Sequence, residues 1–236
     1  MATRKRPVKK PTRRAPPADG ERKRDATRKH LLERALKLFQ QRGVEATTMR
    51  DIAKAAGMSL GAAYYYFPSK EALVFAYYDD NQADIEGRAE QMTGTVREKL
   101  GLLLHGKLET IRPQKKMLAA IVQRLVDPSD PVSAFSVQTR AVRDRAIALF
   151  ARALDDAGVP PEVLPLAARA IWLLQMAMML VYVNDESPGE KRTHGLVDEA
   201  LDMIVPVLPL LATPIGRSLV ERISGALGRA GITGEA

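Results

Sequence analysis

The 236-residue chain contains no cysteine. This absence excludes disulfides, thiolate nucleophiles and Cys-based zinc sites, and it is compatible with a reducing compartment. The three histidines lie far apart in the sequence without zinc-site spacing, so we expect no metal and no cofactor. His105, alone on an apolar stretch, is expected to be a hydrogen-bonded interior residue rather than a ligand.

Long apolar runs are also scarce. The longest, residues 171–183, is interrupted by Gln175 and falls short of the roughly 20 residues that span a bilayer, so it predicts a buried helix. No apolar segment of the signal-peptide kind follows the charged N-terminus, which favours a cytoplasmic protein. The sequence shows no nucleophile–base pair, phosphate loop or carboxylate pair with supporting context, which argues against an enzyme.

Positive charge is abundant but unevenly placed. Residues 1–24 hold ten Lys/Arg and two acids, residues 25–70 hold eight and four, and the remainder holds 18 and 22, giving net charges of +8, +4 and −4. This asymmetry suggests a bound polyanion, with nucleic acid the leading candidate and an anionic membrane surface second; a solvated tail that aids solubility is the alternative. Five prolines and glycines among the basic residues predict that residues 1–24 form a disordered tail.

The rest of the chain has the periodicity of helices, with no strict alternation and no Asn-Gly hairpin signal, so the predicted fold class is all-α. Pro206 and Pro209 predict a kink or an end near Val205 in the helix that contains them. The expected helices span about 25–42, 49–56, 60–67, 69–92, 95–111, 114–126, 133–156, 162–184, 193–211 and 215–229.

Two short helices joined by AAGMS, residues 55–59, have the arrangement of a helix-turn-helix. Ala53 is small enough for the second helix to cross close to the first, and Gly57 suits the left-handed backbone of the turn. Thr48 and Asp51 have the spacing of a capping box, with Asp in place of the usual Glu or Gln. Ser59 is expected to cap the second helix, and Ser69 the helix that follows Pro68.

The second helix carries three consecutive tyrosines, which cannot share one face because successive side chains are about 100° apart. If Leu60, Ala63 and Phe67 face the core, the opposite side presents Gly61, Ala62 and Tyr65, flanked by Tyr64 and Tyr66. Small residues would let this helix enter the major groove while tyrosine hydroxyls reach phosphates or base edges; for Tyr64, half-burial against the first helix is an equal alternative. The expected DNA contacts are Thr48, Arg50, Ser59, Gly61, Ala62, Tyr64, Tyr65, Tyr66 and Lys70.

Three motifs then carry a family resemblance: G-x-x-x-T-T-x-x-x-I-A at 43–53, G-x-S-x-G at 57–61 and Y-Y-x-F-x-S-K at 64–70. Through them, the block from Asp25 to Tyr78 resembles the N-terminal domain of the TetR family of bacterial transcriptional regulators. G-x-S-x-G also occurs in hydrolases, but no strand precedes it here. The resemblance implies a three-helix helix-turn-helix DNA-binding domain at 25–70, followed by a helical ligand-binding and dimerisation domain at 71–236. It also places Thr48, Tyr64, Tyr65 and Lys70 where family members contact DNA, whereas the position of Tyr66 is often histidine.

By the same resemblance, the C-terminal domain should hold a cavity for a small effector and a homodimer interface formed by the helices at about 162–184 and 193–211. The first of these is apolar nearly all round, as is typical of a helix buried between its own domain and a partner; a central core helix is the alternative. Candidate pocket residues, each of which fits a core position at least as well, are Met117, Phe135, Trp172, Gln175, Met176, Met179 and Tyr182.

The leading hypothesis is a dimeric, sequence-specific repressor, released from its operator DNA when a small, mainly apolar molecule stabilises a different spacing of its two reading helices. Activation in place of repression stays open. One alternative is a TetR-fold lipid- or partner-binding module whose helix-turn-helix is idle, although the intact contact residues argue against it. The other is an architectural protein that binds nucleic acid without sequence preference through residues 1–24.

Overall fold

A computed structural model of the chain describes residues 19–229. Within this range the secondary structure is entirely helical, without strands, which confirms the predicted fold class. The α-helices are α1 (Asp19–Arg42), α2 (Met49–Ala55), α3 (Leu60–Tyr66), α4 (Lys70–Ala89), α5 (Val96–Ile111), α6 (Lys115–Val126), α7 (Arg140–Ala153), α8 (Leu164–Tyr182), α9 (Lys191–Ile204) and α10 (Pro214–Arg229). Short 3₁₀ helices are η1 (Arg112–Gln114), η2 (Pro188–Glu190) and η3 (Val205–Ala212).

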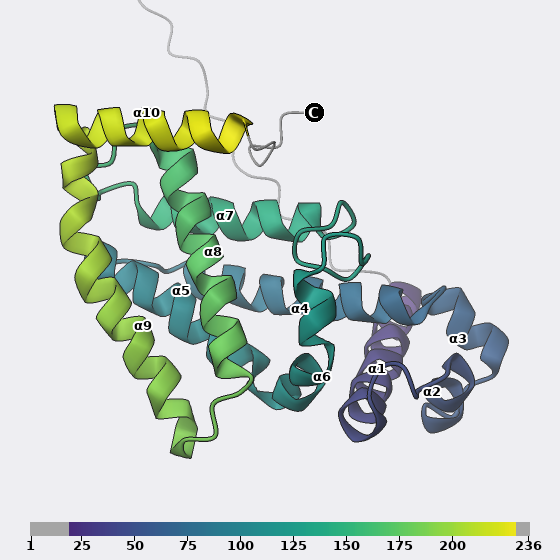
Figure 1. Cartoon of the computed structure of the whole chain (residues 1–236). Helices are drawn as coiled ribbons and strands as arrows, with labels where there is room; N and C mark the ends of the chain where they lie inside the picture. The colour runs from purple at the N-terminus through teal and green to yellow at the C-terminus, as the bar shows by residue number, and fades with distance from the viewer. Residues whose placement is uncertain (1–18, 230–236) are drawn as a thin grey trace, which may run out of the picture.

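The helices fall into two groups joined by α4 (Figure 1). Helices α1–α3 lie at one end of the molecule, and α4 runs from them into the larger group, where it packs on α5 and α7. Helix α8 lies against α7, and α9 packs on α5 and α8. A single cluster of buried side chains extends from Leu31 in α1 to Leu208 in η3, so the two groups share one core.

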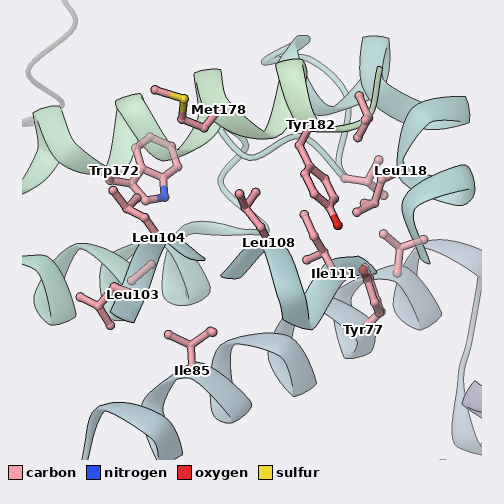
Figure 2. Close-up of a cluster of buried hydrophobic side chains, with 14 of the residues drawn as sticks. Tyr77, Ile85, Leu103, Leu104, Leu108, Ile111, Leu118, Trp172, Met178 and Tyr182 are labelled. Atoms are coloured by element: carbon pink, nitrogen blue, oxygen red, sulfur yellow. The ribbon is translucent and has the colours of Figure 1, made fainter. Parts of the chain in front are cut away.

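The core of the larger group forms where α4, α5 and α8 meet (Figure 2). Burial of one large aliphatic side chain in such a core stabilises a fold by about 1.5–3 kcal/mol relative to exposure. The side chains that meet there include Tyr77 and Ile85 from α4, Leu103, Leu104, Leu108 and Ile111 from α5, and Trp172, Met178 and Tyr182 from α8.

The predicted end of the tail at residue 24 is wrong. Helix α1 begins at Asp19, so residues 19–24, assigned to the tail from their charge, are helical; residues 1–18 lie outside the described part of the chain. Arg and Lys, which make up half of the segment DGERKR, are good helix formers. The helix therefore continues through the basic segment.

The prediction of one helix over 133–156 is also wrong at its start. Residues 133–139 form consecutive turns, and α7 begins only at Arg140. The Thr139 hydroxyl donates to the Ser133 carbonyl (2.6 Å), and the Ser136 hydroxyl donates to the Pro131 carbonyl (2.8 Å). Such side-chain bonds to nearby carbonyls compete with helical hydrogen bonds.

The expected break near Val205 is confirmed. Helix α9 ends at Ile204, and the chain continues as the 3₁₀ helix η3, which contains both prolines. Proline lacks the N–H that an α-helix needs and crowds the preceding turn.

Helix α8 is longer than the apolar run from which it was predicted. Its 19 residues are long and apolar enough to cross a membrane by length and composition, whereas residues 171–183 alone fall short of that length. The segments 188–212 and 214–223 pass the same test only together, and they are bent by 102°. In the fold α8 is packed on α7, α9 and α5, and about a third of it is buried within this chain.

Candidate functional site

The helix-turn-helix begins with the capping box that the sequence predicts. The Asp51 N–H donates to the Thr48 hydroxyl oxygen (3.2 Å), and the Thr48 N–H donates to the Asp51 carboxylate (3.0 Å). Hydrogen bonds from the Thr48 hydroxyl and backbone lower the pKa of the Asp51 carboxyl. The start of α2 is therefore fixed by two residues three positions apart.

The turn between α2 and α3 depends on Gly57. Its φ of 66° lies in the left-handed region, which glycine adopts without steric penalty. The Met58 N–H donates to the Ala53 carbonyl (2.9 Å), and Ala53 itself is buried at the contact between the two helices. Both small residues thus have the roles predicted for them.

Helix α3 presents the predicted faces. Ser59 caps it by accepting from the Ala62 N–H (3.1 Å). Ala63 and Phe67 are buried and Leu60 is partly buried, so this side faces the core. On the opposite side Gly61 is exposed, and a Cβ built on it would meet nothing within 4 Å. The outward backbone of α3 is therefore open to a close approach.

The three tyrosines have different environments. Tyr65 is 68% exposed and Tyr64 is 47% exposed. Tyr66 is partly buried and packs on the core, with its ring edge-on to Tyr65 at 5.3 Å between centroids. Tyr66 therefore acts in part as a support for Tyr65, while the hydroxyl-bearing rings of Tyr64 and Tyr65 reach the surface.

Lys70 has a structural contact that the sequence did not reveal. Its ammonium donates to the Val44 carbonyl (2.8 Å) and the Glu45 carbonyl (3.3 Å), which ties the start of α4 to the loop between α1 and α2. An ammonium has three donor hydrogens, so one is left for a phosphate. Ser69 caps α4 as predicted, accepting from the Ala72 N–H. Thr48 and Arg50 are exposed at the start of α2.

Arg24 was missed by the sequence analysis as part of this surface. Its guanidinium lies 5.7 Å from the centroid of the Tyr65 ring, and Arg28, one turn later, lies 4.9 Å from the Phe67 ring. The Arg24 contact exists because α1 starts before Asp25, whereas Arg28 lies within the predicted helix. The good helix formers among residues 19–24 could have predicted this earlier start, but their charge was taken as a sign of disorder.

The larger group of helices forms a partly open cavity of about 110 Å³ between α4, α5, α6, α7, α8 and the turns at 133–139. Five of the seven predicted pocket residues line it: Phe135, Trp172, Gln175, Met176 and Met179. The Phe135 and Trp172 rings meet edge to face at 5.5 Å. Met117 and Tyr182 do not line the cavity; both are fully buried in the core, and Tyr182 lies under the Lys115 ammonium at 5.0 Å.

Polar groups on the cavity wall were not predicted from the sequence. The Tyr77 hydroxyl is buried without a hydrogen bond of normal geometry. Burial raises its pKa, against a smaller opposing influence of the Asn81 side chain one turn away. Lys107 also lines the cavity, where burial lowers the pKa of its ammonium to about 8, against the opposing influence of Asp84. The Arg143 guanidinium is engaged with the carbonyls of Ala134 (2.9 Å) and Ser136 (3.1 Å).

His105 is hydrogen-bonded, as predicted, but only part-buried. Its Nδ1 lies 2.7 Å from Nδ1 of His194, the rings stack, and its Nε2 lies 3.2 Å from the Asp198 carboxylate. Burial and the nearby His105 lower the pKa of His194. Among residues 19–229 there is no group of three His, Cys, Asp or Glu arranged to hold a metal ion.

Helices α8 and α9 and the segment η3 leave an apolar surface uncovered. Side chains 37–66% exposed are Leu173, Leu180, Val181, Leu196, Met203, Val207 and Leu210. An apolar groove between α8 and the α9–η3 segment, lined by residues such as Ile171, Leu174 and Ile204, adjoins them. Exposed apolar patches of this kind mark interaction surfaces.

Comparison with known proteins places the first helices in a family. The family described as "Bacterial regulatory proteins, tetR family" matches residues 31–77. The transcriptional repressor KstR2 of Rhodococcus jostii is 49% identical over 59 residues, which are 25% of this chain and 29% of that protein. The repressor KstR of Mycolicibacterium smegmatis is 27% identical over 184 residues, covering 77% of this chain and 86% of that protein. For KstR2 of Rhodococcus jostii and two further curated regulators, the chain spans less than a third of the relative's length.

Solved structures match over most of the chain. A TetR transcriptional regulator from Nitrosomonas europaea superposes with a TM-score of 0.61 at 19% identity, covering 75% of this chain and 96% of that one. FadR from Bacillus subtilis, solved in complex with stearoyl-CoA, gives a TM-score of 0.60 at 20% identity, covering 73% and 96%. At this identity the likeness shows the fold alone.

Proposed function

We propose that this chain, which belongs to the TetR family of bacterial regulatory proteins, is a sequence-specific DNA-binding transcriptional repressor that acts as a homodimer. The outward face of α3 is the observation that carries the proposal. Tyr65 is 68% exposed about one turn after Gly61 and Ala62, and the backbone at Gly61 is open. A short helix with this profile fits a major groove, because its backbone approaches the base edges while tyrosine hydroxyls reach the groove walls. The further DNA contacts that we propose are Thr48, Arg50, Ser59, Ala62, Tyr64, Tyr66 and Lys70.

The dimer would form through the apolar surface of α8, α9 and η3. A two-fold axis there gives each protomer the same patch, as a closed dimer requires. The two α3 helices must then meet half-sites about 34–36 Å apart, or a multiple of this spacing. Its place of action would be the cytoplasm, where bacterial DNA lies.

Release by an effector would act through α4. This helix carries the helix-turn-helix at its first residue, where Lys70 holds the loop before α2, and its side chains Tyr77 and Tyr78 line the cavity. A ligand with higher affinity for a different position of α4 shifts the population of dimers away from the spacing that DNA requires. The apolar lining, and the stearoyl-CoA bound to the structurally similar FadR, support a mainly apolar effector.

The test is binding of the full chain to the DNA just upstream of its own gene and to unrelated DNA, at near-physiological salt. We expect tight binding confined to the upstream fragment, lost in Tyr65→Ala and retained in Val137→Ala, a control at an 81% exposed site far from α3 in sequence. Equal binding to both DNAs that disappears on deletion of residues 1–18 would instead support the architectural alternative. No binding to either DNA would favour the partner-binding module.

A further inference from the structure

The cavity wall is mainly apolar. Its polar side chains come from α4, α5, α8 and the segment at the start of α7: Tyr77, Tyr78, Asn81, Gln82, Lys107, Thr139, Arg143 and Gln175. Tyr77 and Asn81 are one turn apart on α4 and line the same wall, where the Tyr77 hydroxyl is buried without a hydrogen-bond partner. A buried hydroxyl left unpaired is destabilising and is rare in native structures. Its proton is therefore available to an acceptor that enters the cavity.

Lys107 supplies a cation on the neighbouring helix. Helices α4 and α5 lie side by side, joined by the Thr110 hydroxyl bond to Asp84 (2.6 Å) and the ion pair of Arg88 with Glu109 (3.0 Å). Asp84, the acidic group that acts on Lys107, is itself paired with Arg88 (3.1 Å). Within the described part of the chain, Lys107 makes no ion pair or hydrogen bond of its own. Its charge is uncompensated beside an apolar space.

The other cation on the wall does not have this freedom. Arg143 donates to the Ala134 and Ser136 carbonyls and holds the turns at 133–139 in place. The cavity thus offers one available positive charge and at least one available O–H donor. A monoanion satisfies both, whereas an amine would place a second cation beside Lys107, and a phosphate dianion would bury an excess negative charge.

We propose that the effector is an apolar monocarboxylate whose head group binds the Lys107 ammonium and the Tyr77 hydroxyl, and whose hydrocarbon body lies against Phe135, Trp172 and Met179. This inference rests on the proposed function, since it names the ligand of the same cavity. The cavity volume of about 110 Å³, at roughly 10–15 Å³ for each water-sized group, has space for about ten non-hydrogen atoms. Octanoate has that size.

Trp172 gives a direct readout because it is the only tryptophan in the sequence and lies on the cavity wall. The full chain is titrated with straight-chain carboxylates from hexanoate to hexadecanoate, and with the methyl ester and the primary amine of each length, while Trp172 fluorescence is recorded. We expect the best acid to bind at least about tenfold tighter than its methyl ester, the effect of one charged hydrogen bond. Equal affinity for acid and ester, or no binding by any acid, would refute the assignment.

Variants separate the head-group role from a structural one. Lys107→Met, which keeps the length of the side chain, should remove the preference for acid over ester, while Lys116→Met, at an exposed position on α6, should leave it unchanged. Tyr77→Phe should weaken acid binding several-fold without lowering the Tm, because the lost hydroxyl has no partner in the protein. A lower Tm with unchanged acid affinity would mean that Tyr77 serves only the core.

Binding to the upstream DNA is measured separately on the unliganded chain, so that the two proposals fail in different ways. Specific DNA binding with acid and ester equally effective would refute the carboxylate site and leave the repressor. Preferential binding of the acid by a chain that does not bind its upstream DNA specifically would support the carboxylate site and refute the repressor.

Discussion

The helix-turn-helix and the cavity-bearing helices differ in how far apart in sequence their defining contacts lie. Thr48 and Asp51 fix the start of α2 across three residues, whereas the start of α9 is fixed by Asp185, which accepts from the N–H and hydroxyl of Thr193 eight residues later (2.9 and 2.7 Å). The DNA-reading face lies on one short helix, while the cavity draws residues from five helices. Local sequence thus specifies the first region, and tertiary packing specifies the second.

Both regions nevertheless share one buried cluster, and α4 belongs to both. A locally encoded domain that is packed on its neighbour in this way should not unfold alone. The predictions below test how far the two regions are separate, in order of decreasing expected effect.

Phe39→Ala should lower the free energy of unfolding of the whole chain by about 3–5 kcal/mol, the usual effect of removing a buried aromatic side chain. Phe39 is 1% exposed in α1, and the cluster it belongs to continues to α8. In Phe39→Ala, the urea midpoint recorded by Trp172 fluorescence in the distant region should therefore fall as much as the midpoint recorded by helicity. Lys37→Ala, at an exposed site two residues away, is the control. An unshifted Trp172 transition would show that the two regions unfold independently.

Asp185→Ala should destabilise the chain by about 2–3 kcal/mol, because hydrogen bonds to a charged acceptor are lost and their buried donors are left unpaired. Burial raises the pKa of the Asp185 carboxyl, but the bonds from Ser187 and Thr193 outweigh burial and hold it well below its ordinary value. The exposed Asp155→Ala is the matched control. Thermal unfolding at pH 7 measures the difference.

The same carboxyl gives a pH dependence. Because its pKa is lower in the folded than in the unfolded chain, it stabilises the fold above the unfolded value of about 4, and this contribution is lost as the pH falls toward the folded value. The wild type should therefore lose more stability than Asp185→Ala between about pH 5 and pH 2. Parallel pH profiles for the two proteins would exclude this role of Asp185.

Sequence patterns were sufficient where a structure depends on neighbours along the chain. Ser59 and Ser69 cap the predicted helices, and Gly57 has the predicted left-handed backbone. The start of α1 was missed because charge was taken as a sign of disorder, although the same residues form helices well. The DNA contacts assigned to these residues stay predictions.

In the second region periodicity identified the helices but not the direction in which each side chain points. Met117 and Met179 both lie on predicted helices and were both expected to line the cavity, yet only Met179 does. Neither Lys107 nor Tyr77 was predicted to line the cavity. A lysine on a helix ordinarily lies at the surface, and only the packing of α4 on α5 places the Lys107 ammonium in the interior. Such assignments require the tertiary arrangement.

Thr48→Val should destabilise the chain by about 1 kcal/mol, since it removes the N-cap of α2 while keeping the shape of the side chain. Thr48→Ser keeps the cap and should be nearly neutral. Asp51→Ala removes the other half of the capping box and frees the Thr48 hydroxyl from the Asp51 carboxylate (2.6 Å), but it keeps that hydroxyl for DNA. A comparison of DNA affinity in the two variants therefore separates capping from recognition. Equal losses of affinity would mean that Thr48 acts through the fold of α2 alone.

Gly61→Ala gives the smallest change in stability and the sharpest test, because its two effects should have opposite signs. Gly61 has helical backbone angles inside α3 and open space at the Cβ position, so alanine should raise the free energy of unfolding by about 0.5–1 kcal/mol. The added methyl group lies on the outward face, where it would hold the helix away from the base edges and weaken operator binding. Chemical unfolding and DNA titration of one protein sample measure both. A variant that is more stable and binds the operator as tightly as the wild type would show that the open backbone of α3 has no part in recognition.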